Sequence, residues 1–134
     1  MHTIVLATPF PIHRIGIETI IRPYFSEVKL IEIQDGEDLI RLLAHREVDL
    51  IIVDPMLPDL LIKRLFEMRE PLKSRPPILV YSEDDELLVG GKFIHMGATG
   101  FIEQKCSREQ LISAISTVLN GDIYLSEKVW ANIE

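Results

Sequence analysis

Few side chains of this sequence stand where they could do chemistry. The most apolar run of the chain ends at a carboxylate, Asp54, and a hydroxyl, Ser82, follows a later apolar run. An aspartate before a proline often caps a turn by accepting backbone N–H groups, and a serine can cap the start of a helix. Each residue therefore has a structural interpretation beside a chemical one, and the surrounding pattern has to decide between them.

The other residues that could bind a metal or react as a nucleophile are scattered. Cys106 lies between Lys105 and Arg108, whose charges can lower the pKa of a thiol; a redox sensor is one interpretation, and an inert cysteine is the favoured one. The sequence has no Gly-rich phosphate loop, which argues against nucleotide binding of that kind. Metal ligand spacing is absent from the four histidines: His2, His13, His45 and His95.

Short apolar runs alternate with longer amphipathic segments, and these elements must position the polar residues. Runs of this length suit buried strands, and an apolar spacing near 3.6 residues suits helices. Five strands alternating with five helices predict an α/β fold with a doubly wound parallel sheet. The expected strands are 3–7, 28–33, 50–53, 77–81 and 100–102, and the expected helices are 11–22, one starting at 35–36, 60–72, 83–96 and 107–119.

In such a sheet the functional crevice lies beyond the carboxyl ends of the strands. A site is therefore expected among the polar residues that follow these strands. They are Thr8-Pro9, Asp54-Pro55, Ser82 and Gln104-Lys105.

Two helices are expected to bury particular faces. The third should bury Leu61, Leu65 and Met68. The first is expected to end at Pro23, because a proline disfavours helix in the residue before it. The residues spaced to share one face of this first helix are Ile12, Ile15, Gly16, Thr19 and Ile20.

The last two helices differ in the strength of their patterns. Gly90-Gly91 in the fourth costs roughly 2 kcal/mol relative to alanine, so this helix is expected to be short, frayed or shifted. The fifth is expected to start at a capping box of Ser107 and Gln110 and to end at Asn120-Gly121.

The composition indicates one globular domain. The chain has 134 residues, of which 47% are hydrophobic and 26% charged. With 14 basic and 21 acidic residues the net charge is −7, which would repel a nucleic acid backbone. No apolar run is long enough to span a membrane, no signal peptide is evident, and the single cysteine agrees with a cytoplasmic location.

Several local strings, in this order, carry a resemblance to a known family. They are Thr8 to Gly16, Asp49 to Pro58, Val80 to Ser82, Gly97 to Ile102 and Asn120 to Ser126. Together they resemble the receiver domain of LuxR-type (NarL-like) response regulators, over essentially the whole chain. The resemblance implies a flavodoxin-like sheet with strand order 2-1-3-4-5 and a regulatory domain that is not an enzyme.

The chemistry implied by the resemblance is phosphoryl transfer onto an aspartate, which needs Mg²⁺, a hydroxyl donor and a lysine. Asp54 stands at the place of the phosphoacceptor, Ser82 at that of the hydroxyl donor, and Phe101 at that of the family's aromatic switch residue. Ser82 can instead cap the fourth helix with Asp85 as its partner, and Phe101 can be an ordinary core residue.

The sequence departs from the family pattern at the positions that hold the metal and the phosphoryl group. Thr8 and Pro9 stand in place of two acidic residues, and neither supplies an anionic ligand for Mg²⁺. Gln104 stands in place of the lysine, and strand alternation should point Lys105 away, toward solvent. No cofactor is therefore expected, and Mg²⁺ binding should be weak or absent.

The resulting interpretation is a pseudo-receiver, a regulatory module that acts without conventional Mg²⁺-dependent phosphorylation. Residues 1–126 would form the receiver-like domain, and residues 127–134 would start a linker to a helix-turn-helix domain that alone contacts DNA. Family precedent implies a homodimer, formed through the first and last helices or through the fourth helix, fifth strand and fifth helix. A sensor kinase is a further expected partner, and a membrane is not.

Two alternatives stay open from the sequence. One is a working phospho-receiver in which Asp54 is modified and the metal is held by backbone, water and other acids such as Asp59. The other is a small-molecule sensor or a flavodoxin-like enzyme that uses the same crevice, for which the sequence has no motif.

Overall fold

The computed structural model describes residues 2–72 and 75–133. The last residue of the expected linker, at position 134, lies outside these described residues. The elements are β1 (His2–Ala7), α1 (Pro11–Tyr24), β2 (Val28–Ile33), α2 (Gly36–His45), β3 (Leu50–Val53), α3 (Ile62–Arg69), β4 (Ile78–Ser82), α4 (Glu86–Met96), β5 (Gly100–Glu103), α5 (Arg108–Leu119) and α6 (Glu127–Ile133).

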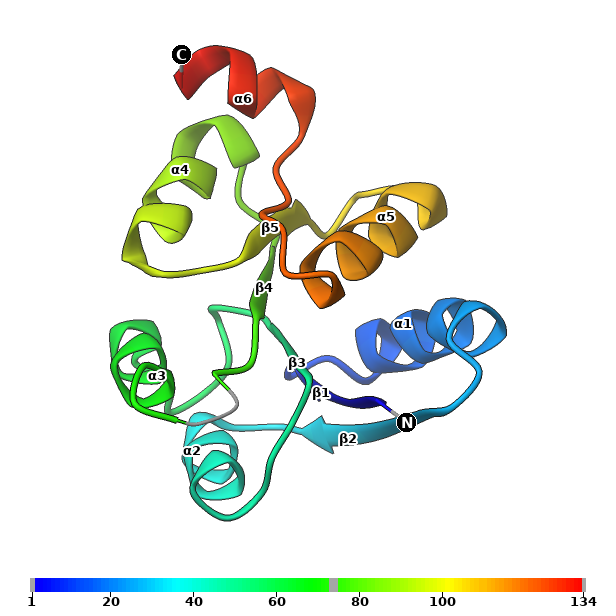
Figure 1. The fold of residues 1–134 in the computed structure, drawn as a ribbon, viewed down its shortest axis with the longest axis vertical. Helices are drawn as coiled ribbons and strands as arrows, with labels where there is room; N and C mark the ends of the chain where they lie inside the picture. Colours follow the sequence, from blue (N-terminus) through cyan, green and yellow to red (C-terminus); the bar gives the residue numbers. More distant parts are fainter. Residues whose placement is uncertain (1, 73–74, 134) are drawn as a thin grey trace.

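The strands form one parallel sheet in the order β2-β1-β3-β4-β5, which confirms the predicted fold and strand order. Helices α1 and α5 cover one face, and α2, α3 and α4 cover the other (Figure 1). Strands β3 and β4 are buried along their whole length, whereas β2, at the edge, alternates between half-buried and exposed residues. The apolar runs are therefore continuous only where helices cover the sheet on both faces.

Side chains that alternate along the strands form a separate core on each face. Val5 and Ile51 face α2, α3 and α4, while Ile4 and Ile52 face α1 and α5. This division follows from the two-residue period of a strand.

Helix α1 differs from the sequence-based expectation. Its buried residues are Arg14, Ile17 and Ile21, whereas Ile12 and Ile15 are 79% and 64% exposed. The expected apolar face thus points mainly to solvent, because the residues that reach the sheet lie on an adjacent stripe of the helix. The helix also continues one residue past Pro23, since a proline near the end of a helix removes few hydrogen bonds.

Helix α3 is shorter than predicted and is rotated relative to the predicted face. Leu61, expected to be buried, precedes the helix and is 74% exposed. Leu65 is buried as predicted, and the other buried residues are Phe66 and Arg69. The guanidinium of Arg69 donates hydrogen bonds to the carbonyl oxygens of Gly97 at 2.6 Å and Pro76 at 3.5 Å, so it joins α3 to the segments that flank β4 and β5.

Helix α4 begins three residues later than predicted and runs unbroken through the two glycines. Gly90 is buried, and a Cβ at this position would lie 3.1 Å from Cγ of Glu86 and 3.7 Å from the side chains of Leu125 and Phe101. The close packing of α4 against β5 and the C-terminal segment explains why a small residue is present in the middle of the helix.

Helices α2 and α5 begin where the sequence predicted, and the predicted capping box of α5 is confirmed. Asp35 accepts a hydrogen bond from the N–H of Asp38 at the start of α2, and Ser107 and Gln110 form a reciprocal capping box at the start of α5. After α5, Gly121 adopts a φ of 87°, a conformation that favours glycine, and turns the chain back toward the sheet.

The segment that follows α5 lies along β5. Tyr124 donates its N–H to the carbonyl of Thr99 at 3.0 Å and accepts the N–H of Phe101 at 3.1 Å, which closes the free edge of β5. The chain then continues into α6, which packs beside α4 (Figure 1). Leu125 and Val129, 5% and 3% exposed, complete the core on this side.

Candidate functional site

The carboxyl ends of β1, β3 and β4 meet at one edge of the sheet, as expected of parallel strands. Thr8, Asp54 and Ser82, the residues at these ends, are 2%, 2% and 3% exposed. The N–H of Asp54 donates to the carbonyl of Ala7 at 2.9 Å, which ties the end of β3 to β1. The structure thus places the predicted site residues next to one another.

The carboxylate of Asp54 is fully engaged by the protein. Gln104 Nε2 donates to Asp54 Oδ2 at 2.9 Å, and the backbone N–H of Met56 donates to Asp54 Oδ1 at 2.8 Å. The second contact is the turn cap anticipated from the Asp-Pro sequence. The first contact joins residues 50 positions apart, which the sequence placed at the same edge of the sheet without predicting a hydrogen bond between them.

Gln104 is held in place by two further bonds. Its N–H donates to the carbonyl of Ser82 at 2.8 Å, and its Nε2 also donates to the carbonyl of Tyr81 at 3.1 Å. Lys105 is exposed as predicted, although it lies in the turn after β5 and not within the strand. The group that reaches Asp54 from the end of β5 is therefore a neutral amide and not an ammonium group.

The end of β1 presents no carboxylate to Asp54. Thr8 Oγ1 lies 3.4 Å from the N–H of Phe10, a weak local contact, and Pro9 is half-buried. A buried guanidinium approaches instead, since Arg14 Nη1 donates to the carbonyl of Thr8 at 2.6 Å and Arg14 Nε lies 3.7 Å from the carboxylate of Glu32. The guanidinium therefore fixes the backbone at the end of β1 and pairs with Glu32 on β2.

Ser82 is engaged with the start of α4 and not with Asp54. Its Oγ accepts the N–H of Asp84 at 3.1 Å and lies 3.5 Å from the Asp84 carboxylate. The predicted cap of α4 by Ser82 is wrong by three residues, because Asp85 is the N-cap and accepts the N–H of Leu87. Ser82 nevertheless caps a backbone N–H, that of Asp84, in the turn that precedes α4.

Phe101 lies in the core on the α4 side of the sheet. It is fully buried, and its ring stacks on Phe93 with 5.8 Å between the ring centroids. This is the position expected of a core aromatic residue, and its ring also contacts the element, α4, that follows Ser82.

The described residues do not assemble a metal site. No group of three or more His, Cys, Asp or Glu side chains gathers closely enough to hold an ion within residues 2–72 and 75–133. Asp59, the additional acid considered from the sequence, lines a different cavity beside Gly36 at the start of α2. The residues present around Asp54 therefore do not fit Mg²⁺, which takes several oxygen ligands in octahedral geometry.

Burial dominates the acid–base behaviour of the groups beside the site. Burial raises the pKa of Tyr81 to about 12, with smaller contributions from the charges of Cys106 and Asp54. Burial likewise raises the pKa of the Cys106 thiol, outweighing a backbone hydrogen bond that lowers it. Cys106 therefore lacks the low thiol pKa of a redox sensor, in agreement with an inert cysteine.

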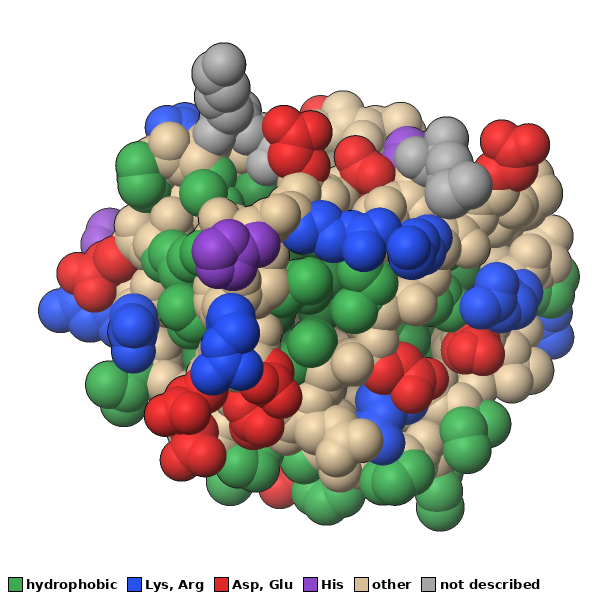
Figure 2. Space-filling model, turned by 90° about the horizontal axis from the view of Figure 1, so that it is seen from below, with side chains coloured by type: hydrophobic (Ala, Val, Ile, Leu, Met, Phe, Trp, Pro, Cys, Tyr) green, Lys and Arg blue, Asp and Glu red, His purple; other side chains and the backbone are tan. Residues whose placement is uncertain are grey.

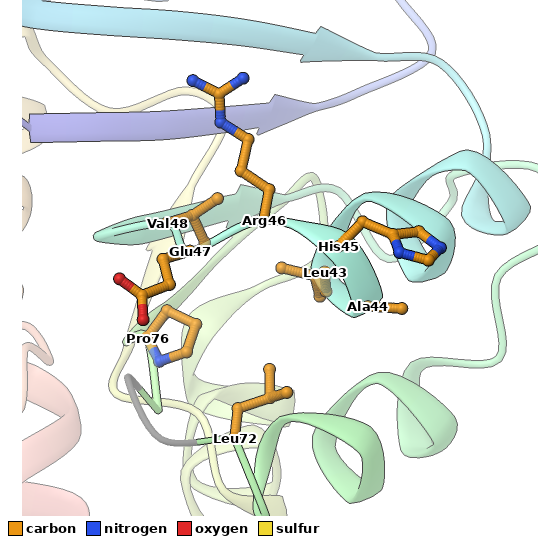
Figure 3. A pocket seen from close by; sticks show the side chains of 8 residues that line it. All are labelled: Leu43, Ala44, His45, Arg46, Glu47, Val48, Leu72 and Pro76. Carbon is orange, nitrogen blue, oxygen red and sulfur yellow. The ribbon is translucent and has the colours of Figure 1, made fainter.

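A second cavity lies at the opposite end of the sheet. It measures about 260 Å³, and apolar side chains from α2 and from the chain before β4 surround it, among them Leu43, Leu72 and Pro76. The lining also includes His45, Arg46 and Glu47. Figure 3 shows the Glu47 side chain beside Pro76, whereas those of His45 and Arg46 point away.

On the side of α2 and β2, neither acidic nor basic side chains dominate the described surface. Figure 2 shows acidic and basic side chains interspersed there with small hydrophobic areas. Within the described residues, no helix is both long and apolar enough to cross a bilayer.

The fold and the position of Asp54 define the class of protein. The family model of the response regulator receiver domain matches residues 4–116, and the chain belongs to this family. A curated relative, the glycerol metabolism activator of Pseudomonas putida, is 31% identical over 127 residues, which are 93% of this chain and 57% of that protein. The transcriptional regulatory protein UhpA of Escherichia coli is 31% identical over 98 residues, which are 73% of this chain and 48% of that protein.

Solved structures agree with this assignment. A LuxR family two-component response regulator from Aurantimonas superposes with a TM-score of 0.82 at 21% identity, covering 96% of this chain and 92% of that one. The isolated receiver domain of RcsB from Salmonella enterica, in the presence of a phosphomimetic, also gives 0.82, at 17% identity and 97% and 96% coverage. The sequence-based recognition of a receiver domain is thereby confirmed. The chain spans about half the length of the curated relatives named above.

Proposed function

We propose that this receiver domain regulates transcription without conventional Mg²⁺-dependent phosphorylation of Asp54. The observation that carries the proposal is the hydrogen bond from Gln104 Nε2 to Asp54 Oδ2, which together with the Met56 N–H occupies both carboxylate oxygens. Aspartyl phosphorylation needs a carboxylate oxygen that attacks the phosphoryl group and a metal that neutralises the charge that develops. Each Asp54 oxygen already accepts a hydrogen bond from the protein, and the described residues gather no set of acidic ligands for the metal.

The same contacts give Asp54 a structural role. A buried carboxylate is costly unless its oxygens are hydrogen-bonded, and here a neutral amide and a backbone N–H satisfy them. Gln104 thus links the ends of β3, β4 and β5 through its bonds to Asp54, Tyr81 and Ser82. This arrangement favours one fixed conformation of the crevice over a switch between two.

The decisive experiment is intact-mass analysis after incubation with acetyl phosphate, with and without Mg²⁺. The wild-type chain is expected to gain no phosphoryl group, and Asp54→Asn is the control for the site of any gain. A triple variant with Thr8→Asp, Pro9→Asp and Gln104→Lys restores the missing groups. It is expected to gain one phosphoryl group only with Mg²⁺. A Mg²⁺-dependent gain by the wild-type chain that Asp54→Asn abolishes would establish the phospho-receiver instead.

The partners follow from the class of protein and the surface of the domain. We propose that it is one part of a LuxR-type regulator in which another domain contacts DNA, since this chain carries a net charge of −7. The named relatives are regulators, which supports a signalling role in place of enzymatic turnover. An upstream kinase would have no acceptor to modify under this proposal.

We further propose a homodimer through α1. Ile12 and Ile15 are 79% and 64% exposed on neighbouring turns, and a Cβ added at Gly16 beside them would meet nothing within 4 Å. An apolar stripe of this kind favours association with a second apolar surface. Residues 122–130 already cover part of the alternative face, made by α4 and β5.

The oligomeric state tests which face is used. Ile15→Glu is expected to convert a dimer to a monomer in light scattering coupled to size-exclusion chromatography. Leu88→Glu is the matched variant, because Leu88 is 80% exposed on α4, and it should leave the dimer intact. The opposite pattern would assign the dimer to the α4 face.

A further inference from the structure

A cavity of about 520 Å³ lies between the end of β5, the start of α5 and the segment before α6. Its lining includes Ile102, Cys106, Tyr124 and Ser126. Gln104 and Met56, which donate to the Asp54 carboxylate, do not line it. The charged residues of the lining are three acids and one base: Glu86, Glu103, Glu127 and Lys105. The volume exceeds what a single water or metal ion needs and suits a small organic molecule.

Glu86 is the most buried of the charged residues that line this cavity. It is only 5% exposed, and its Oε2 accepts the N–H of Ser126 at 2.8 Å. No ion pair of Glu86 is found among the described side chains, and its second oxygen has no hydrogen-bond donor there. A mostly buried carboxylate that accepts one protein hydrogen bond gains stability from a positive charge placed beside it. The position therefore suits a cation.

Ser126 supplies a second polar group without a partner. Its Oγ is buried and makes no hydrogen bond with the described residues, although its backbone N–H is bonded to Glu86. A hydroxyl oxygen can accept an N–H from a ligand that sits on the carboxylate. An acceptor and a carboxylate thus belong to neighbouring residues in the lining of one cavity.

The remaining walls favour an organic cation over a metal ion. Burial raises the pKa of Tyr124, and the negative charge of Glu86 raises it further, so the phenol lies within the field of that carboxylate. Ile102 and the Tyr124 ring add apolar surface, and an ammonium group over a tyrosine ring is favourable. Metal-binding side-chain clusters are absent from the described part of the chain.

We propose that this cavity binds a small organic cation whose ammonium group pairs with Glu86 and donates a hydrogen bond to Ser126 Oγ. Such a ligand joins α4 to the residues just before α6. It therefore holds the C-terminal segment against α4 and provides an input to the domain that bypasses Asp54. The inference goes beyond the proposed function, and it holds or fails whether or not Asp54 accepts a phosphoryl group.

The test is a titration of the full chain with 1,4-diaminobutane and with n-butylamine, up to about 10 mM. Trp130, the sole tryptophan, lies on α6 and reports on the docking of this helix through its fluorescence. A saturable change in emission and a rise in melting temperature are expected. 1-Butanol, which has the same carbon chain as n-butylamine and no charge, should produce neither.

Two charge-matched variants locate the binding. Glu86→Gln keeps an acceptor for the Ser126 N–H and is expected to weaken amine binding at least about tenfold. Glu83→Gln removes one negative charge from an exposed position outside the cavity and should bind as the wild type does. If Glu86→Gln fails to fold, Ser126→Ala takes its place, with an expected loss of affinity of about threefold or more.

Three outcomes would overturn the proposal. The first is the absence of any saturable response of the wild-type chain to either amine. The second is an equal response from the wild type and from the cavity variant. The third is an equal response to 1-butanol, which would show an apolar site that makes no use of Glu86.

Discussion

At the scale of single residues, the crevice of this receiver domain is organised by an amide. Gln104 donates to the Asp54 carboxylate and to the Tyr81 carbonyl from the same nitrogen, and the backbone of Gln104 is fixed by Ser82. A glutamine cannot neutralise a phosphoryl group, but it can satisfy a buried aspartate. Under the proposed function, Gln104 therefore contributes a structural contact at this position.

Gln104→Ala is expected to lower the free energy of unfolding by about 1–3 kcal/mol, because it leaves a buried carboxylate oxygen and a carbonyl without donors. Urea unfolding followed by circular dichroism measures the loss. Lys105→Ala, at the exposed neighbouring position, should change stability by less than about 0.5 kcal/mol. Equal stability of the two variants would show that the amide contributes nothing to the folded state.

Cys106 is expected to react slowly with iodoacetamide. Burial raises the pKa of its thiol above the ordinary value of 9.0, so the reactive thiolate fraction at pH 7.5 is smaller than in a free thiol. The alkylation rate should increase as the pH rises toward and beyond that value. In urea the rate should approach that of N-acetylcysteine, and a folded chain that already reacts as fast would contradict the burial argument.

At the scale of elements, two glycines have opposite surroundings. A Cβ on Gly36, at the start of α2, would overlap the backbone carbonyl of Asp59, and Gly36 also donates its N–H to the carbonyl of Pro58 at 2.6 Å. Gly16, in α1, has an open surrounding. The close approach of α2 to the chain after β3 therefore requires a glycine at position 36, whereas position 16 has room for a side chain.

Gly36→Ala should destabilise the domain by about 1–3 kcal/mol, because the chain after β3 has to move. Gly16→Ala should stabilise it by about 0.5–1 kcal/mol, as expected when alanine replaces glycine inside an exposed helix. Thermal unfolding of both variants tests the pair, measured at a protein concentration at which each is monomeric. A neutral Gly36→Ala would mean that this contact is loose in solution.

At the scale of the whole molecule, the C-terminal segment is part of the receiver domain's packing. Tyr124 pairs with the edge of β5, Ser126 bonds to Glu86 on α4, and Val129 is buried against the core. Any further domain that follows α6 would therefore be connected to a helix that packs against α4 and to a segment that pairs with β5. A change in the packing of α4 or β5 would therefore alter the contacts that hold α6.

Val129→Asp is expected to undock α6 while the rest of the domain stays folded. Burying an unpaired carboxylate is costly, so the helix releases it to water. Limited proteolysis of the C-terminal segment should accelerate by about tenfold or more, and Trp130 emission should shift to the red. Ala131→Asp, on an exposed position of the same helix, is the control and should behave as the wild type. Resistance equal to that of the wild type would show that Val129 does not hold the helix.

The sequence by itself determined the fold class and the place of the site. Alternation of apolar runs with amphipathic segments predicted the parallel sheet, and the residues after each strand had to converge, because parallel strands end at a common edge. Local caps such as Asp35 and Ser107 were equally readable, since their partners lie within three residues. The resemblance to receiver domains added the strand order and the expectation that Asp54 stands at the place of the phosphoacceptor.

Only the tertiary structure decided which face of α1 is buried, why α4 tolerates Gly90, and which donor reaches Asp54. Each depends on a contact between residues far apart in the chain, such as the 50-residue separation of Asp54 and Gln104. The cavity lined by Glu86 and Ser126 likewise exists only because the chain returns past β5 after α5. Sequence patterns encode the period of an element, whereas the meeting of distant side chains is set by how the elements pack.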